Sequence, residues 1–428
     1  MYRWILLGAL CLVYLFGIGP AFYGFGVALT PTAEALGLSR AQASLGYSLL
    51  ALTLGLAGPL VAWLIGRIGS RWTIFVGGLV AAGGATLVAT TSAYPLYLIG
   101  AGVLLGLGVA MQTILPGTTM VTNWFARRRS LAMGIFLTAG GLGGFIAAPT
   151  ISSLIAATGT YRTAWWAIAV SGVIAGVIGL VFARDKPEDM GLAPDGVAQG
   201  AAAGVAQGAA TGVAQGAATA RVYQTPREWG VGAALRTPTF WMIVAASSVF
   251  GLGLQIVNSQ LVAHLSALGV TAGVAAGALG TMALLSAVSR LIGGPIGDRV
   301  EPRMLLAVGL IGQLAGALLL VSASDTVLVY TAVVVFGVGY GVAFVAVPSL
   351  IANYFGREAY PRLYGIRLPI ATVVGAIGPV AAGLVFDAVG SYTMVFIGYA
   401  VLAGVAAVIA FLARPVSAPE PVPVADPV

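Results

Sequence analysis

The sequence predicts an all-α membrane protein with twelve transmembrane helices in two pseudo-symmetric six-helix bundles. Of its 428 residues, 59% are hydrophobic and only 8% are charged, whereas a soluble domain carries about 25% charged residues. Long apolar runs recur along the chain, and the two sides of one long polar segment carry the same short motifs in the same order. This composition excludes a soluble globular protein.

The apolar runs define the predicted helices, because a helix needs about 20 mostly apolar residues to cross a membrane. Cutting the chain at charges and turn residues gives about twelve runs of this length. The predicted spans are 4–29, 41–65, 72–91, 95–122, 130–157, 163–183, 239–264, 271–296, 303–322, 326–353, 363–386 and 391–413.

The basic residues orient these helices. With the N-terminus in the cytoplasm, the single lysine, Lys186, and most arginines fall on or near the cytoplasmic side, and only Arg40 and Arg162 fall outside. This asymmetry follows the positive-inside rule. The formal charge of +7 is therefore a topology signal, and no nucleic-acid partner is expected. We predict a multi-pass protein of the inner (plasma) membrane with both termini cytoplasmic.

The polar interruption divides the chain into an N-terminal six-helix bundle (1–183), a cytoplasmic linker (184–238), a C-terminal bundle (239–414) and a cytoplasmic tail (415–428). Within the linker, residues 197–220 hold three copies of an eight-residue VAQGAA repeat without charged or aromatic residues. Such a composition predicts a flexible or weakly helical connection.

The two halves resemble each other. Phe16–Gly19 (FGIG) recurs as Phe250–Gly253 (FGLG), and Asn123–Phe125 (NWF) recurs as Asn353–Phe355 (NYF). Parallel repeats about an axis normal to the membrane are a transporter design, with the substrate site between the halves near the midplane.

A further motif pair resembles a known family. Gly58–Leu60 (GPL) with Gly66–Arg71 (GRIGSR), and their counterpart Gly293–Arg299 (GGPIGDR), are similar to the helix 2–3 signature of the major facilitator superfamily. The first copy has Gly66 where the family usually has an acidic residue, and the second has Asp298. The resemblance implies cytoplasmic gating roles for Arg67, Arg71, Asp298 and Arg299.

Within this superfamily the chain resembles the monocarboxylate porter and oxalate:formate antiporter group. The resemblance rests on Ser286–Arg290 (SAVSR) inside helix 8, on the NWF motif after helix 4, and on Gly375–Pro379 (GAIGP) in helix 11. It implies transport by alternating access, with helices 1, 4, 7, 8, 10 and 11 lining the cavity.

Arg290 is the strongest candidate for substrate binding. It lies eight residues before Asp298, about 12 Å along a helix, against a half-membrane core of about 15 Å. A charge at that depth costs from about 2.5 to more than 10 kcal/mol. All acidic residues fall in loops, tails or helix ends, so the expected partner is a bound anion. The alternative is an arginine that snorkels to the interface.

The number of buried cations also predicts the substrate class. One guanidinium grips one carboxylate through two parallel hydrogen bonds. A dianion such as oxalate is better matched by two cations, and the resemblance to the antiporters of this group implies a lysine in helix 11 as the second one. This chain has Pro369–Thr372 in that region and no lysine, which favours a monocarboxylate. Arg367, nearer the cytoplasm, is either a positive-inside anchor or a cation of the entry vestibule.

Other polar and aromatic residues in the spans are candidates for contacts with the substrate or the proton. Their structural alternatives are interhelical hydrogen bonds, bonds to the helix backbone, and packing. The substrate-binding candidates are Tyr340, Ser286, Gln112, Asn258, Gln255, Phe22 and Tyr23, and the proton-coupling candidate is His264.

We therefore expect a functional monomer that carries a small monocarboxylate, such as lactate or pyruvate, together with a proton, in contact with membrane lipid. Exchange of organic anions and an anion sensor that does not transport remain the alternatives. The single histidine and the lack of intramembrane carboxylates leave no general acid–base pair. No enzyme activity, cofactor or metal site is expected.

Overall fold

The computed structural model describes residues 2–125, 128–192, 222–226, 228–297, 299–323, 325–356 and 358–415. Eleven helical segments in these ranges are long and apolar enough to cross a membrane. The remaining predicted span, 41–65, is the 17-residue helix α3 (Arg40–Leu56), which continues after Ala57 into the first turns of α4 (Gly58–Thr90). The prediction of a twelve-helix, all-α membrane protein is confirmed.

The elements of the N-terminal half are α1 (Tyr2–Ile18), η1 (Gly19–Gly24), α2 (Phe25–Leu36), α3, α4, α5 (Tyr94–Tyr97), η2 (Leu98–Leu104), α6 (Leu105–Gln112), α7 (Ile114–Trp124), α8 (Arg129–Thr158) and α9 (Arg162–Phe182). Two short elements follow, η3 (Glu188–Met190) and α11 (Val231–Leu235). The C-terminal half contains α12 (Pro238–Ala267), α13 (Ala272–Gly297), α14 (Pro302–Val321), α15 (Thr326–Phe355), α16 (Tyr360–Val389) and α17 (Thr393–Leu412).

Prolines and glycines change the regular α-helical backbone at three places in the N-terminal half. Pro20 lies in η1, a π-helical stretch that joins α1 to α2 in one continuous span. Pro116 follows Thr113, whose φ of −107° and ψ of −103° separate α6 from α7, because a proline ring clashes with the carbonyl four residues earlier. Gly69 breaks α4 at a φ of 78°, which only glycine adopts without strain. This break separates the second and third transmembrane helices.

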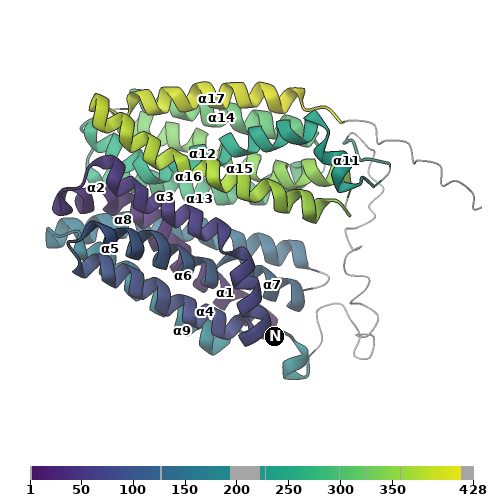
Figure 1. Ribbon diagram of the computed structural model, residues 1–428, viewed down its shortest axis with the longest axis horizontal. Helices are drawn as coiled ribbons and strands as arrows, with labels where there is room; N and C mark the ends of the chain where they lie inside the picture. Colours follow the sequence, from purple (N-terminus) through teal and green to yellow (C-terminus); the bar gives the residue numbers. More distant parts are fainter. Residues whose placement is uncertain are drawn as a thin grey trace, which may run out of the picture.

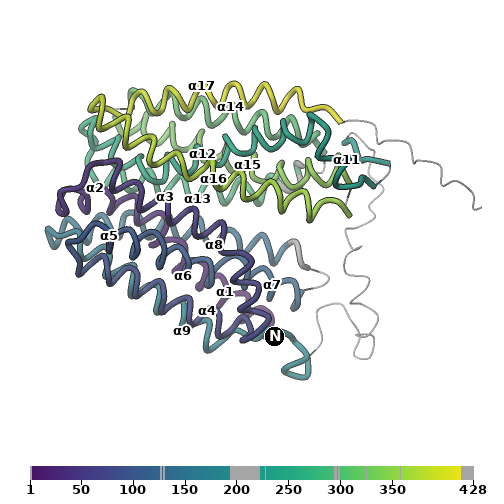
Figure 2. The backbone as a smooth tube through the Cα atoms, viewed as in Figure 1, coloured from purple at the N-terminus to yellow at the C-terminus, as the bar shows by residue number. Residues whose placement is uncertain are grey.

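The two halves form two bundles that lie side by side (Figure 1). The N-terminal bundle is purple to blue and the C-terminal bundle is teal to yellow, and Figure 2 follows the same arrangement as a tube. The N-terminus and α11 lie at one end of the bundles, and α2 reaches the opposite end. We name these the inner end and the outer end after the predicted orientation, in which the N-terminus is cytoplasmic.

Glycines allow the helices to pack closely. A Cβ atom on Gly309 of α14 would lie 2.6 Å from the carbonyl oxygen of Gly339 on α15. The two bundles meet mainly through α8 with α13 and through α3 with α16. At the first of these contacts, a Cβ atom on Gly141 would lie 2.5 Å from the carbonyl oxygen of Ala283. Small residues permit such close approach in membranes.

The last part of the predicted linker packs on the C-terminal bundle. Trp229 is 5% exposed and meets the ring of Phe355 edge-on at 5.4 Å between centroids. The backbone N–H of Tyr223 donates to a Glu301 carboxylate oxygen at 3.1 Å. The VAQGAA repeats at 197–220 lie outside the described residues.

The packing of α8 against α1 predicts that alanine substitutions at two glycines, Gly143 and Gly8, have different effects on the free energy of unfolding. A Cβ atom on Gly143 would lie 2.5 Å from the carbonyl oxygen of Leu15, whereas one on Gly8 would meet no atom within 4 Å. We expect Gly143→Ala to lower the free energy of unfolding by about 1–3 kcal/mol through overpacking. The matched Gly8→Ala variant should be neutral or slightly stabilising. Thermal unfolding in detergent measures both, and equal midpoints would contradict this packing.

Candidate functional site

Arg290 lies on α13, two turns before the inner end of that helix, and is half-buried. Its guanidinium carbon lies 4.0 Å from the ring centroid of Phe344 and 5.3 Å from that of Tyr340. Both rings belong to α15, and the faces of aromatic rings attract cations. The side chain therefore lies against a neighbouring helix.

No acidic side chain pairs with Arg290 in the part of the chain that the structure describes. The ion pair found in those ranges joins Arg40 to Glu34 at 3.0 Å. The Nε atom of Arg290 is buried and has no hydrogen-bond partner among the described residues. Because an unpaired buried donor on a charged group is costly, the guanidinium is suited to receive an anion.

Three tyrosines lie within electrostatic reach of this cation. Tyr14 of α1 and Tyr23 of η1 come from the N-terminal bundle, and Tyr340 comes from the C-terminal bundle. All three are buried and lie close enough to Arg290 to interact with it electrostatically. Their hydroxyl groups form no hydrogen bond with any described residue. A tyrosine hydroxyl can donate to a carboxylate, so both bundles offer donors beside the guanidinium.

Tyr14 is absent from the sequence-based candidates. The sequence did hold a signal that could have identified it. Tyr14 lies in the middle of the first predicted span, and the family resemblance implies that this helix lines the cavity. In the structure its ring packs on Phe136 at 4.8 Å between centroids. A Cβ atom on Gly140 would lie 2.4 Å from this ring, so only a very small residue fits beside Tyr14.

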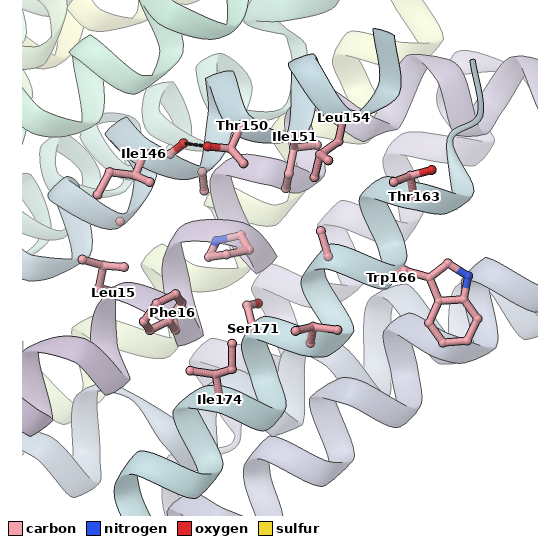
Figure 3. Close-up of a pocket in the computed structure, with 15 residues that line it drawn as sticks. Leu15, Phe16, Ile146, Thr150, Ile151, Leu154, Thr163, Trp166, Ser171 and Ile174 are labelled. Atoms are coloured by element: carbon pink, nitrogen blue, oxygen red, sulfur yellow. Dashed lines mark hydrogen bonds between the residues drawn. The ribbon is translucent and has the colours of Figure 1, made fainter. Parts of the chain in front are cut away.

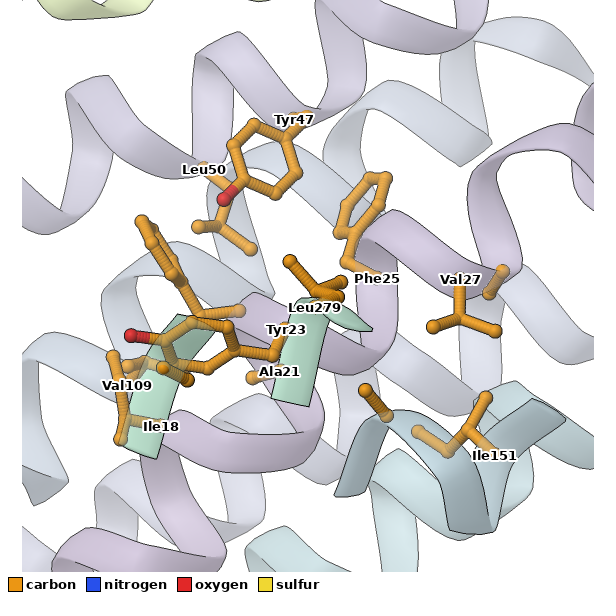
Figure 4. Close-up of a cluster of buried hydrophobic side chains, with 14 of the residues drawn as sticks. Ile18, Ala21, Tyr23, Phe25, Val27, Tyr47, Leu50, Val109, Ile151 and Leu279 are labelled. Atoms are coloured by element: carbon orange, nitrogen blue, oxygen red, sulfur yellow. The ribbon is translucent and has the colours of Figure 1, made fainter. Parts of the chain in front are cut away.

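Aromatic rings fix the tyrosines in place. Phe250 stacks on Tyr340 with centroids 4.5 Å apart and an interplanar angle of 15°. Phe22 contacts both Tyr23 and Tyr47, at 5.8 and 5.4 Å between centroids. In Figure 4, Tyr23 and Tyr47 lie in this cluster with Leu279 beside them, and Leu279 belongs to α13 of the other bundle. Phe22 and Tyr23 thus pack in a cluster to which both bundles contribute, and the contact with substrate predicted for them stays a prediction.

A second polar group lies toward the outer end. The Tyr47 hydroxyl lies near the Asn258 side chain, and both are buried. Neither the hydroxyl nor the side-chain nitrogen and oxygen of Asn258 has a hydrogen-bond partner of good geometry within the described ranges. The backbone carbonyl of Asn258 packs directly on Gly26. Asn258 therefore lies at the contact between the bundles.

Arg367 is more deeply placed than the sequence suggests. Helix α16 begins at Tyr360, before the predicted start at 363, and Arg367 is only 5% exposed. Its Nε–H donates to the Ser247 hydroxyl oxygen at 2.9 Å, and a terminal N–H donates to the Ser247 carbonyl at 3.2 Å. Tyr340 interacts electrostatically with both Arg290 and Arg367. A second cation thus lies near the ring that contacts the first.

Three other substrate candidates make contacts within their own bundle. The Ser286 hydroxyl donates to the Ala283 carbonyl at 2.9 Å, which is the backbone alternative. The Gln112 side chain donates to the Gly172 carbonyl at 3.0 Å and ties α6 to α9. Gln255 packs against Gly375 of α16, and its side-chain oxygen is buried without a partner in the described ranges.

His264 lies apart from the Arg290 group. It is 1% exposed, and its Nε2 atom lies 2.8 Å from the Leu320 carbonyl oxygen. Its ring packs on Phe396 at 4.4 Å between centroids. These contacts join α12 to α14 and α17, so the structure gives His264 a packing role near the outer end.

The residues of the predicted cytoplasmic motif do not form ion pairs with one another in the described ranges. Arg67 is exposed, with its guanidinium 5.5 Å from the Trp63 ring centroid. The Nε–H of Arg71 donates to the Leu180 carbonyl. Arg299 is exposed, and Asp298 lies outside the described residues.

A carboxylate that the sequence analysis missed lies at this motif. Asp185 accepts a hydrogen bond from the backbone N–H of Ser70 at 2.8 Å. This N–H begins the helix after the break at Gly69, and such N–H groups lack partners within the helix. Asp185 thus places a carboxylate at the break in α4, beside Gly69 and Ser70.

An apolar groove of about 400 Å³ lies on the N-terminal bundle between α1, η1, α8 and α9. Figure 3 shows Leu15, Phe16 and Ile174 on its walls, with the Thr150 hydroxyl bonded to the Ile146 carbonyl at 2.7 Å. None of its lining residues carries a charge, so it does not suit a small anion.

The sequence profile of the Major Facilitator Superfamily matches residues 10–368 and 248–426. The chain belongs to the Major Facilitator Superfamily. It is therefore a multi-pass membrane transporter and not an enzyme.

Related proteins support this membership. The chain is 30% identical to monocarboxylate transporter 13 of Rattus norvegicus over 356 residues, which cover 81% of this chain and 74% of that one. It is 23% identical to the oxalate:formate antiporter of Oxalobacter formigenes over 370 residues, which cover 85% and 80%.

Solved structures share the fold. A bacterial homologue of the human lysosomal transporter Spinster, in an inward-facing and unoccupied conformation, superposes with a TM-score of 0.74 at 17% identity. The match covers 96% of this chain and 97% of that one. The two-bundle architecture of this superfamily member is therefore shared with known transporters.

The contacts of Arg367 predict that alanine substitutions at two neighbouring serines, Ser247 and Ser248, lower the stability of the protein by different amounts. Ser247→Ala removes the oxygen that accepts from the Arg367 Nε–H, and an unsatisfied buried donor costs about 1–3 kcal/mol. The Ser248 hydroxyl donates only to its own helix, at the Val244 carbonyl, so Ser248→Ala should cost much less. Thermal unfolding of the two variants tests this, and an equal loss in both would contradict the role of Ser247.

Proposed function

We propose that this transporter carries small organic monocarboxylates, similar in size to lactate and pyruvate, with Arg290 binding the carboxylate. One observation carries the proposal: a half-buried guanidinium has no acidic partner within the described ranges and lies among three tyrosines whose hydroxyls are free of hydrogen bonds there. The name of the relative from Rattus norvegicus agrees with this substrate class.

The anion completes the electrostatics of the site. Two N–H groups of Arg290 bind the two carboxylate oxygens in parallel. Tyr14 and Tyr23 of the N-terminal bundle donate to the same carboxylate, and Tyr340 donates from the other bundle. The bound anion thereby links the bundles and favours their closure around the site. Without it, closure would bury an uncompensated cation, which is costly.

We propose that transport is coupled to a proton by alternating access. His264 is bonded to the Leu320 carbonyl away from Arg290, so we assign it no part in the coupling. The proton travels with the substrate or through the tyrosine hydroxyls beside Arg290. We further propose that the protein works as a monomer in the inner membrane, with both termini in the cytoplasm.

Exchange of organic anions is the second candidate function. It is favoured by Arg367, which lies buried and interacts electrostatically with Tyr340, as Arg290 does. Two cations match a dicarboxylate better than one. The printed name of the relative from Oxalobacter formigenes, an oxalate:formate antiporter, agrees with this alternative.

Substitutions of Arg290 test the binding role. Arg290→Lys keeps the charge but loses the two-pronged geometry, and we expect affinity for lactate or pyruvate to fall about ten- to a hundredfold. Arg290→Ala should abolish uptake into proteoliposomes. The control is Arg362→Lys, because Arg362 is exposed near the start of α16 and far along the helix from the outer end, and it should transport normally. Thermal shifts with lactate measure affinity independently, and wild-type affinity in Arg290→Lys would refute the assignment.

The coupling mode is tested with proteoliposomes that are empty or preloaded with lactate. We expect an inward proton gradient to drive lactate uptake into empty vesicles, because the bound anion and a proton cross together. A tenfold excess of oxalate should compete poorly, since one carboxylate already satisfies Arg290. Uptake that requires preloading and is blocked by oxalate would favour the exchanger instead.

A further inference from the structure

A carboxylate joins the two bundles at the outer end. Asp387, near the end of α16, accepts hydrogen bonds from the backbone N–H groups of Arg40 at 3.0 Å and Ala41 at 2.9 Å. These are the first two N–H groups of α3, in the other bundle. The first N–H groups of a helix have no partner within the helix, and they carry a partial positive charge. Ser39 and Gln42 form a capping box that bonds the N–H groups of these same two residues, and Asp387 satisfies the two N–H groups that lie between them.

Close packing accompanies this contact. A Cβ atom on Gly383, one turn before Asp387, would lie 2.6 Å from the Cα atom of Ala41. The Arg40 guanidinium lies 5.6 Å from the ring centroid of Phe386. The bundles therefore meet here without space for a larger residue.

No basic side chain in the described ranges forms an ion pair with Asp387, and its two carboxylate oxygens accept from backbone N–H groups. Arg40 is paired with Glu34 of its own bundle, with 3.0 Å between nitrogen and oxygen. Tyr392 also faces Asp387 and Arg40, and burial raises the pKa of Tyr392 to about 12, so it stays neutral. Glu34 thus balances Arg40 within one bundle, and Asp387 makes the bonds that cross to the other.

A second bond crosses between the same bundles one turn further in. The Gln260 side chain of α12 donates to the Ser44 hydroxyl of α3 at 2.8 Å. Ser44 is fully buried. Its side chain can meet water from the outer side only when α3 separates from the C-terminal bundle.

We propose that Asp387 is a latch that holds the outer end closed and sets the balance between inward-facing and outward-facing states. Alternating access must separate α3 from α16 at this end, so both Asp387 bonds break in every cycle. Weakening the latch shifts the population toward the outward-facing state. This inference does not depend on the identity of the substrate.

The test measures opening of the outer end directly. A Ser44→Cys reporter in a Cys11→Ser background is treated with a membrane-impermeant maleimide from the outer side. We expect Asp387→Asn to raise the labelling rate about three- to tenfold, because the amide keeps only one accepting oxygen. The matched control is Glu34→Gln, which removes an acidic group at the same end but no bond between bundles, and it should leave the rate unchanged.

Two further measurements separate opening from unfolding. A second reporter, Ala164→Cys, lies fully buried inside the N-terminal bundle and should stay unlabelled. Asp387→Glu keeps the negative charge but moves the carboxylate by one methylene group. Its labelling rate at Ser44→Cys should fall between that of the Cys11→Ser, Ser44→Cys protein with Asp387 intact and that of Asp387→Asn. The proposal is overturned if Asp387→Asn labels Ser44→Cys no faster than the parent, if Glu34→Gln raises the rate equally, or if both reporters become labelled together.

Discussion

A guanidinium inside an apolar bundle needs compensation, and this requirement organises the centre of the molecule. Within the described ranges, Arg290 is stabilised by the faces of Phe344 and Tyr340 instead of a carboxylate. Aromatic faces attract a cation but do not neutralise it. The site therefore keeps a net positive charge and unpaired donors, which is the condition under which a small anion has the most to contribute.

The surrounding helices are packed to hold that geometry. Gly141 on α8 lies against Ala283 and Ala287 on α13, which brings the N-terminal bundle close to the helix that carries Arg290. The stacking of Phe250 on Tyr340 fixes the ring that the guanidinium contacts. In the transport cycle that we propose, the contacts between the bundles open and close, and the polar bonds of Asp387 hold one of these contacts closed.

The sequence predicted the helices well, and it predicted that Arg290 has no acidic partner in the described ranges, because both depend on local features. Apolar length and charge placement predicted most spans to within a few residues, although the first, predicted as 4–29, continues through α2 to Leu36. The lack of acidic residues near Arg290 was readable along the chain. The burial of Arg367 was not predictable, because it depends on the Ser247 contact across α12 and on where α16 begins. Asp185 was missed because its partner, Ser70, is distant in sequence.

The site around Tyr14 shows a further limit of sequence periodicity. Nine residues separate Tyr14 from Tyr23, and in a regular α-helix that spacing directs two side chains to opposite faces, at about 100° per residue. The π-helical stretch from Gly19 to Gly24 changes this register, and both tyrosines lie within electrostatic reach of Arg290. Wide turns of this kind are frequent at functional sites, but a regular helical pattern does not reveal them.

The packed end of the linker has a practical consequence for how this protein can be divided. Trp229 and Tyr223 already belong to the C-terminal bundle through Phe355 and Glu301, and Asp185 belongs to the N-terminal bundle through Ser70. A polypeptide break introduced between 193 and 221 leaves every one of these contacts intact. The transporter is thus suited to expression as two separate fragments that reassemble in the bilayer, because each fragment keeps its own contacts at the inner end.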